Sequence, residues 1–103
     1  LKSVHRANPQ HLDSFFHKGI ELAELERHEK AIEVFDKILD RHKGNVNVIY
    51  AKARSKAAMN EVNEAFDLLN VAIKQSKAIK LWARKEKVFQ KFYDDPEFQR
   101  MVK

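Results

Sequence analysis

The feature that most constrains this chain is a helical segment that recurs at a fixed interval. The segment HEKAIEVFDKIL begins at His28, and VNEAFDLLNVAI begins thirty-four residues later, at Val62. Apolar residues return every three or four positions in both segments, as they do on one face of a helix. A repeat of this length indicates stacked helix pairs, because each pair buries its apolar face against the next copy. The apolar positions coincide between the copies: Ala31 falls on Ala65, Ile32 on Phe66, Phe35 on Leu69 and Leu39 on Ile73.

The same helical spacing continues along most of the chain and is interrupted at residues 26–28, 43–45 and 60–61. We expect Gly44 to end a helix in the left-handed conformation and Asn60 to adopt a positive φ in a tight turn. Asp95, Pro96 and Glu97 are the residue types that begin a helix. With only two Gly and two Pro, the chain has few of the residues that reverse strands. The sequence therefore predicts an all-α fold of antiparallel helix pairs.

A helix–turn–helix period of thirty-four residues resembles the tetratricopeptide repeat family. Gly19 and Ala53 match the family's small residue in the first helix of a repeat. The second helices match the family's pattern of a small, a large and a small or apolar residue, with Ala31, Phe35 and Ile38 in one repeat and Ala65, Leu69 and Ala72 in the other. Lys18 and Lys52 depart from the family's usual Leu, and Lys43 and Lys77 depart from its usual Pro.

The resemblance implies a right-handed superhelix of antiparallel helix pairs, an α-solenoid, in a single domain. Residues 1–11 would be the tail of a preceding repeat or an N-terminal helix. Residues 12–45 and 46–79 would be two repeats, and residues 80–103, with Asp95, Pro96 and Phe98, would be capping helices. We expect Gly19 to approach Ala31 closely and Phe35 to fill the wedge toward the next helix, because a larger side chain at a helix crossing pushes the backbones apart.

The sequence contains no pattern that predicts catalysis, a metal site or a cofactor. There is no Gly-rich phosphate loop, and no Ser lies in a nucleophile elbow. There is no Cys, and no two of the five His have the i, i+4 spacing of a helical metal pair. We therefore expect a protein that is not an enzyme. The absence of Cys favours a cytoplasmic location, and no apolar run approaches the roughly 20 residues of a membrane span.

The resemblance also implies a concave groove that the first helix of each pair lines. The aromatic residues outside this groove, Trp82 among them, are expected in the core because they follow the helical spacing. A groove with apolar, aromatic and basic side chains suits a peptide or a helix that presents apolar anchors and an acidic group. We therefore interpret the chain as a protein–protein interaction module or scaffold. The expected groove residues are Asp13, Phe16, His17, Ile20, Asn47, Tyr50, Ala57, Arg54, Leu81, Arg84, Lys85 and Val88.

Two alternative functions remain open. The first is self-association, in which an open helical face at Leu1, Val4, Leu12 and Phe16 pairs with a second copy. The second is electrostatic binding of nucleic acid or an acidic surface, because residues 74–103 carry nine Lys and Arg against four Asp and Glu. Nucleic acid is the less favoured partner, since no aromatic residue for base stacking is interleaved with these charges. The basic stripe, expected on one helix face, consists of Lys77, Lys80, Arg84, Lys87 and Lys91.

Overall fold

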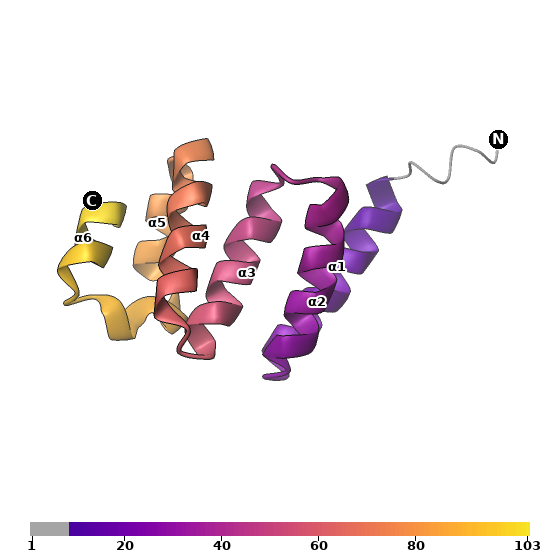
Figure 1. The fold of residues 1–103 in the computed structure, drawn as a ribbon, viewed down its shortest axis with the longest axis horizontal. Helices are drawn as coiled ribbons and strands as arrows, with labels where there is room; N and C mark the ends of the chain where they lie inside the picture. Colours follow the sequence, from indigo (N-terminus) through magenta and orange to yellow (C-terminus); the bar gives the residue numbers. More distant parts are fainter. Residues whose placement is uncertain (1–8) are drawn as a thin grey trace.

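The computed structural model describes residues 9–103, with side chains described from Leu12 onward. Residues 1–8, which belong to the segment expected to be the tail of a preceding repeat or an N-terminal helix, lie outside the described residues. Helices are the only regular elements within residues 9–103, which confirms the predicted all-α fold, and they follow one another in a row along the molecule (Figure 1). The elements are α1 (Pro9–Glu24), α2 (His28–Arg41), α3 (Val46–Ala58), α4 (Val62–Gln75), α5 (Ala78–Lys85), the 3₁₀ helix η2 (Lys87–Phe92) and α6 (Pro96–Val102).

The turns that join α1 to α2 and α3 to α4 have the same backbone structure thirty-four residues apart. Glu26 and Asn60 both have a φ of 64°, which confirms the prediction for Asn60. The amide that follows each of these residues reaches back across the turn, as in a Schellman motif. These bonds run from Arg27 N to the Leu22 carbonyl over 2.8 Å and from Glu61 N to the Lys56 carbonyl over 2.9 Å. The internal repeat is therefore present in the hydrogen bonds as well as in the side chains.

Gly44 does not have the expected left-handed conformation, because neither glycine has a positive φ. Helix α2 ends instead at His42, which has a φ of −130° and donates its N–H to the Ile38 carbonyl over 2.8 Å. Gly44 lies in the turn between His42 and Asn45, and Asn45 then caps α3 by accepting a hydrogen bond from the Val48 amide at 3.3 Å. The turn leads directly into the Asn45 cap of α3, and this arrangement does not require a left-handed conformation at Gly44.

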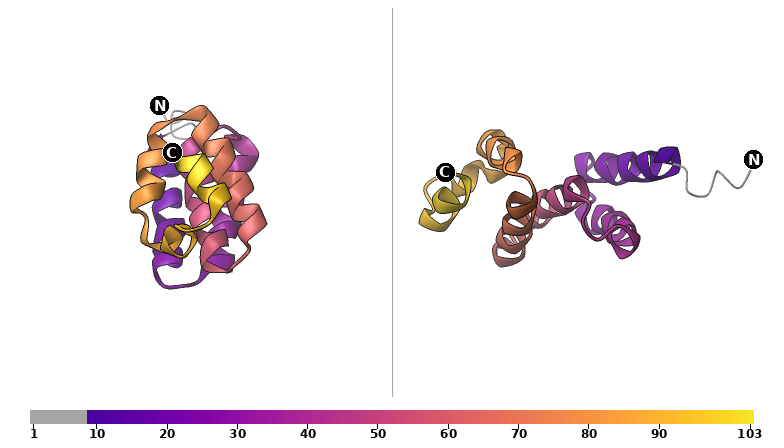
Figure 2. Two further views of the ribbon diagram at one scale, coloured as in Figure 1. Left: turned by 90° about the vertical axis from the view of Figure 1, so that its left-hand side faces the viewer. Right: turned by 90° about the horizontal axis from the view of Figure 1, so that it is seen from above.

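Helix α3 is central and buries side chains on more than one face. It lies between α1 and α5 on one side and α2 and α4 on the other (Figure 2). Val48 and Ala51 pack in a cluster with α2, whereas Ile49, Tyr50 and Ala53 pack in a second cluster with α4 and the C-terminal elements. Because α3 takes part in both clusters, it joins the two halves of the core.

Gly19 is the point of close approach between α1 and α2, as expected. A Cβ atom added at Gly19 would lie 2.6 Å from Cε1 of Phe35 and 3.0 Å from Cγ1 of Val34. The nearest atoms therefore belong to Phe35 and Val34 and not to Ala31, the expected neighbour. Gly19 leaves room for a buried aromatic ring and not only for a second backbone.

Helix α5 departs from the thirty-four-residue period. Four residues separate α2 from α3, whereas only two separate α4 from α5. Helix α5 consequently begins thirty-two residues after α3. Ile79 and Ala83 are its buried residues, and the apolar side chains of Leu81 and Trp82 are 50% and 47% exposed. The expectation that Trp82 lies in the core is wrong.

The chain closes over the end of the core after Glu86, an extended residue that separates α5 from η2. Asp95 caps α6, because its Oδ1 accepts hydrogen bonds from the amides of Glu97 at 2.8 Å and Phe98 at 3.2 Å. The predicted helix start at residues 95–97 is therefore confirmed. Phe98 is fully buried against the rings of Phe66, Phe89 and Phe92.

Candidate functional site

A concave pocket of about 350 Å³ lies over α3, between α1 and α5. Its floor is one face of α3, because the four α3 residues that line it are spaced i, i+3, i+4 and i+7. Each wall comes from two residues one helical turn apart. We call this pocket the α3 groove; its lining consists of Phe16 and Ile20 from α1, Asn47, Tyr50, Ala51 and Arg54 from α3, Trp82 from α5, and Glu86, which follows α5.

The aromatic side chains on the α3 and α5 sides of the groove are a buried ring, Tyr50, and a partly exposed ring, Trp82. The Tyr50 ring is buried and meets the Phe89 ring edge-on, with 6.0 Å between the centroids. The Trp82 ring packs edge-on against Tyr50 at 5.6 Å. This edge contact is a favourable arrangement for two aromatic rings. Phe89 therefore supports Tyr50, and Tyr50 supports Trp82, which keeps nearly half of its surface exposed.

The charged groups of the α3 groove form a pair. Arg54 NH1 lies 3.3 Å from Oε1 of Glu86, and the Tyr50 hydroxyl donates to the same oxygen over 3.4 Å. Burial, with a contribution from the Glu86 carboxylate, raises the pKa of Tyr50 well above its ordinary value. The hydroxyl therefore stays protonated and able to donate. The Arg54 guanidinium also lies 5.6 Å from the centroid of the Tyr50 ring, a cation–π contact.

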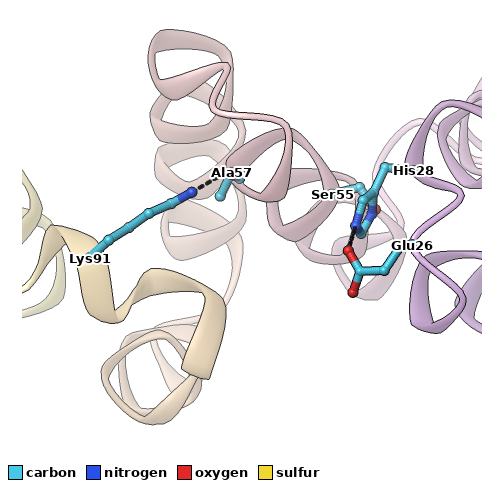
Figure 3. A network of polar contacts seen from close by, with 5 residues as sticks. All are labelled: Glu26, His28, Ser55, Ala57 and Lys91. Atoms are coloured by element: carbon cyan, nitrogen blue, oxygen red, sulfur yellow. Dashed lines mark hydrogen bonds and ion pairs between the residues drawn. The ribbon is translucent and has the colours of Figure 1, made fainter.

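A second pocket of about 460 Å³ adjoins the α3 groove and shares Ala51, Arg54 and Glu86 with it. Its lining includes a chain of polar contacts between the α1–α2 turn and α3 (Figure 3). His28 Nδ1 lies 3.2 Å from the Ser55 hydroxyl, and His28 Nε2 lies 3.0 Å from Oε1 of Glu26. The contacts fix the position of the turn relative to α3.

Glu26, His28 and Ser55 present a carboxylate, an imidazole and a hydroxyl in the same order as a hydrolytic triad does. The exposure of the side chains argues against such a role. Ser55 is 1% exposed in the last turn of α3, whereas Glu26, which would have to orient the imidazole from a buried position, is exposed. Because the hydroxyl is almost entirely covered and the carboxylate is exposed, we interpret the cluster as a link between the α1–α2 turn and α3.

Five of the residues predicted for the groove line it: Phe16, Ile20, Asn47, Tyr50 and Arg54. Asp13 and His17 are exposed on α1 outside this lining, Lys85 is exposed at the end of α5, and Val88 lines the second pocket. Ala57 is buried in the core, and Leu81 is exposed outside the lining.

Arg84 also lies outside the lining of the α3 groove, and its guanidinium donates to the Val102 carbonyl of α6. Sequence reasoning also missed Trp82 and Glu86, which occupy the positions expected for Arg84 and Val88. The cause is the short connection before α5. A shift of two residues turns a helix by about 200°, so the opposite face of α5 meets the groove.

The predicted basic stripe is not a single helix face. Lys77 precedes α5 and Lys80 and Arg84 lie on it, whereas Lys87 and Lys91 lie on η2 beyond the bend at Glu86. Three of these cations also donate to carbonyl groups at the ends of helices, which lack partners within the helix. Lys91 Nζ reaches the Ala57 carbonyl at 2.7 Å (Figure 3), Lys80 reaches that of Lys103 at 3.1 Å, and Arg84 reaches that of Val102.

The face predicted for self-association is described only in part. Leu1 and Val4 lie outside the described residues, and Leu12 and Phe16 are half-buried against the cluster around Phe35. Within residues 9–103, no three His, Asp or Glu side chains form a group that could hold a metal ion. No helix in this described part of the chain is long and apolar enough to cross a membrane.

Comparison of the sequence with models of known protein families, with curated proteins and with solved structures found no match.

Proposed function

We propose that this protein is a non-catalytic protein–protein interaction module that holds a peptide or helix of its partner in the α3 groove. The proposal includes the architecture that the repeat implies, a right-handed superhelix of the tetratricopeptide kind. The observation that carries it is Trp82, a large apolar side chain that is 47% exposed at the wall of a concave pocket. An exposed aromatic residue beside a pocket is typical of a binding surface.

The residue types in the groove support this proposal, because Trp, Tyr and Arg are the residues that most often dominate binding energy at interfaces. A Trp side chain buries roughly 200 Å² when it is fully covered. Covering the exposed half of Trp82 would therefore remove about 100 Å² of mostly apolar surface from water and contribute roughly 2.5 kcal/mol. Phe16 and Ile20 on the opposite wall are half-buried and would add to this contribution.

The partner's main anchor is an apolar side chain. The sequence prediction of an acidic group relied on Arg54, Arg84 and Lys85. Arg54 is already paired with Glu86, and Arg84 donates to a carbonyl of α6. An acidic group of a partner would have to compete with Glu86 for Arg54. Apolar contact with Trp82 needs no such competition.

The test compares two neighbouring residues of α5 in an affinity pull-down from cell extract. Trp82→Ala removes the exposed side chain in the α3 groove, and Leu81→Ala removes a side chain of similar exposure outside it. We expect a protein that the wild-type chain retains to be lost with Trp82→Ala and kept with Leu81→Ala. Equal retention by the two variants, both folded by circular dichroism, would show that the groove is not the binding surface.

A further inference from the structure

The polar groups of the α3 groove carry no net charge, yet they offer both hydrogen-bond donors and acceptors. Asn47 lies exposed at one end of the floor, and a carboxamide contributes one acceptor oxygen and two N–H donors. Arg54 and Glu86 form an ion pair at the other end. At both ends a donor therefore lies beside an acceptor. This combination matches a peptide amide, which presents one N–H and one C=O.

The ion pair keeps hydrogen-bonding capacity for a ligand. The Arg54 and Tyr50 hydrogen bonds to Glu86 both go to Oε1, so they leave Oε2 available as an acceptor. A guanidinium has five N–H donors, and Arg54 uses NH1 for Glu86. Both side chains are also partly exposed, at 32% for Arg54 and 25% for Glu86. A peptide unit could accept from Arg54 and donate to Glu86 without breaking the pair.

The length of the floor suits an extended chain. Asn47 and Arg54 are seven residues apart on α3, which corresponds to roughly 10 Å along the helix axis. An extended peptide covers about the same distance with three residues. The side chain of the middle residue would then lie beside Tyr50, between Phe16 and Trp82, where the lining is apolar.

We propose that the α3 groove binds an extended peptide segment through a large, uncharged apolar side chain and through the main-chain amides on either side of it. Asn47 and the Arg54–Glu86 pair bind these amides. The inference rests on the proposed function and specifies its ligand. It favours an extended segment over a helix, because the amides within a helix are already hydrogen-bonded to one another. It also favours an internal segment over a chain terminus.

The charge of the ligand follows from the ion pair. A carboxylate placed at this end of the groove would be attracted by Arg54 and repelled by Glu86, and an ammonium group would experience the reverse. Either charge would also lose part of its hydration on entering the pocket, with no unpaired charge in the described lining to compensate. A neutral amide loses less hydration and finds a donor and an acceptor together.

The experiment uses three small probes that share the leucine side chain and differ in charge, each charged probe having one peptide unit fewer than the neutral one. N-acetylleucine amide is neutral and has a peptide unit on each side, N-acetylleucine is an anion, and leucine amide is a cation at about pH 6. Trp82 is the only Trp of the chain, so its fluorescence reports binding at the groove without a label. We expect the neutral probe to shift the emission to shorter wavelength, with a Kd on the order of 1 mM. It should bind about fivefold more tightly than each charged probe.

A charge variant of the pair supplies the second measurement. Glu86→Gln preserves the shape of the side chain and leaves Arg54 as an unpaired cation. We expect this variant to bind N-acetylleucine about fivefold more tightly than the wild type does. Glu33→Gln is the matched control, because it makes the same change on the exposed face of α2, outside the groove. The control should keep the wild-type preference for the neutral probe.

The possible outcomes separate this inference from the proposed function. If a charged probe binds the wild type most tightly, the α3 groove is a binding site but the amide assignment is wrong. The same conclusion follows if Glu86→Gln does not bind N-acetylleucine more tightly than the wild type does. If no probe changes the Trp82 emission, the inference is wrong, whereas the proposed function still depends on whether Trp82→Ala loses a partner that Leu81→Ala retains.

Discussion

Replacing Gly19 by Ala should destabilise the protein, although Ala is the better helix former. Gly19 lies inside α1, where the change to Ala would by itself stabilise the helix by about 1 kcal/mol. The added Cβ, however, would lie 2.6 Å from Cε1 of Phe35, which is closer than such atoms approach in folded proteins. The clash therefore opposes the gain in helix propensity, and the sign of the effect depends on whether the Phe35 ring can move.

The surroundings of Phe35 decide the sign. Phe35 is fully buried, and its ring packs against the Phe16 ring with 5.9 Å between the centroids. Because the ring is enclosed by the core, it cannot move into solvent, and room for the Cβ requires the surrounding side chains or α1 and α2 to shift. Overpacking of this kind costs about 1–3 kcal/mol. After subtraction of the helix gain from the middle of this range, we expect a net loss of about 1 kcal/mol. In a domain of this size that loss corresponds to a decrease in Tm of roughly 4–8 °C.

Gly44 provides the matched control, because it is exposed and its φ is not positive. A Cβ added there would meet only the Oε1 atom of Gln75, at 3.8 Å. Gly44→Ala should therefore stabilise the protein by about 0.5 kcal/mol, through the reduced freedom of the unfolded chain. Urea unfolding followed by circular dichroism measures both variants. If Gly19→Ala is as stable as the wild type, or if Phe35→Leu does not reduce the cost of Gly19→Ala, the contact with Phe35 does not control the stability of this helix pair.

Three further predictions concern single residues. The pKa of Tyr50 is raised in the folded protein, so the neutral hydroxyl contributes fully to stability at pH values below 10.0, the ordinary pKa that applies to the unfolded chain. The free energy of unfolding should therefore fall above about pH 10, by up to about 1.4 kcal/mol per pH unit. Tyr50→Phe should show a smaller fall in urea unfolding between about pH 9 and 11. Asp95→Ala removes the cap of α6 and should cost about 1 kcal/mol, most of which Asp95→Asn should restore in thermal unfolding. Glu26→Gly relieves a left-handed backbone and should raise the free energy of unfolding by about 1 kcal/mol, whereas a decrease would mean that the contact with His28 outweighs the strain.

Most of the fold could be predicted because its determinants are local. The spacing of apolar residues gave the helices, and the thirty-four-residue interval gave two equivalent turns, down to the positive φ of Asn60. The start of α6 followed from Asp95 and Pro96, whose side chains act on the adjacent backbone. The prediction for Gly44 failed because its conformation depends on how α2 ends and α3 begins, and glycine permits several conformations.

The part of the candidate site that could be predicted lies on α1 and α3. These helices keep the period of the repeat, so residues such as Phe16, Tyr50 and Arg54 fall on the face that the period indicates. The prediction failed on α5. A repeat carries its register forward only while the connections keep their length, and the connection before α5 is two residues shorter.

The sequence by itself determined the helices, their pairing and the equivalence of the α1–α2 and α3–α4 turns, because helices and turns depend on residues close in the chain and the pairing follows from the short connections between consecutive helices. Only the tertiary structure decided which face of α5 meets α3 and how the charges are used. It brings Trp82 and Glu86 into the groove, pairs Glu86 with Arg54, and directs Lys80, Arg84 and Lys91 to the ends of helices. These contacts join segments that are distant in the chain, and they depend on the exact rotation of each helix. A difference of two residues in one connection is enough to reverse that rotation.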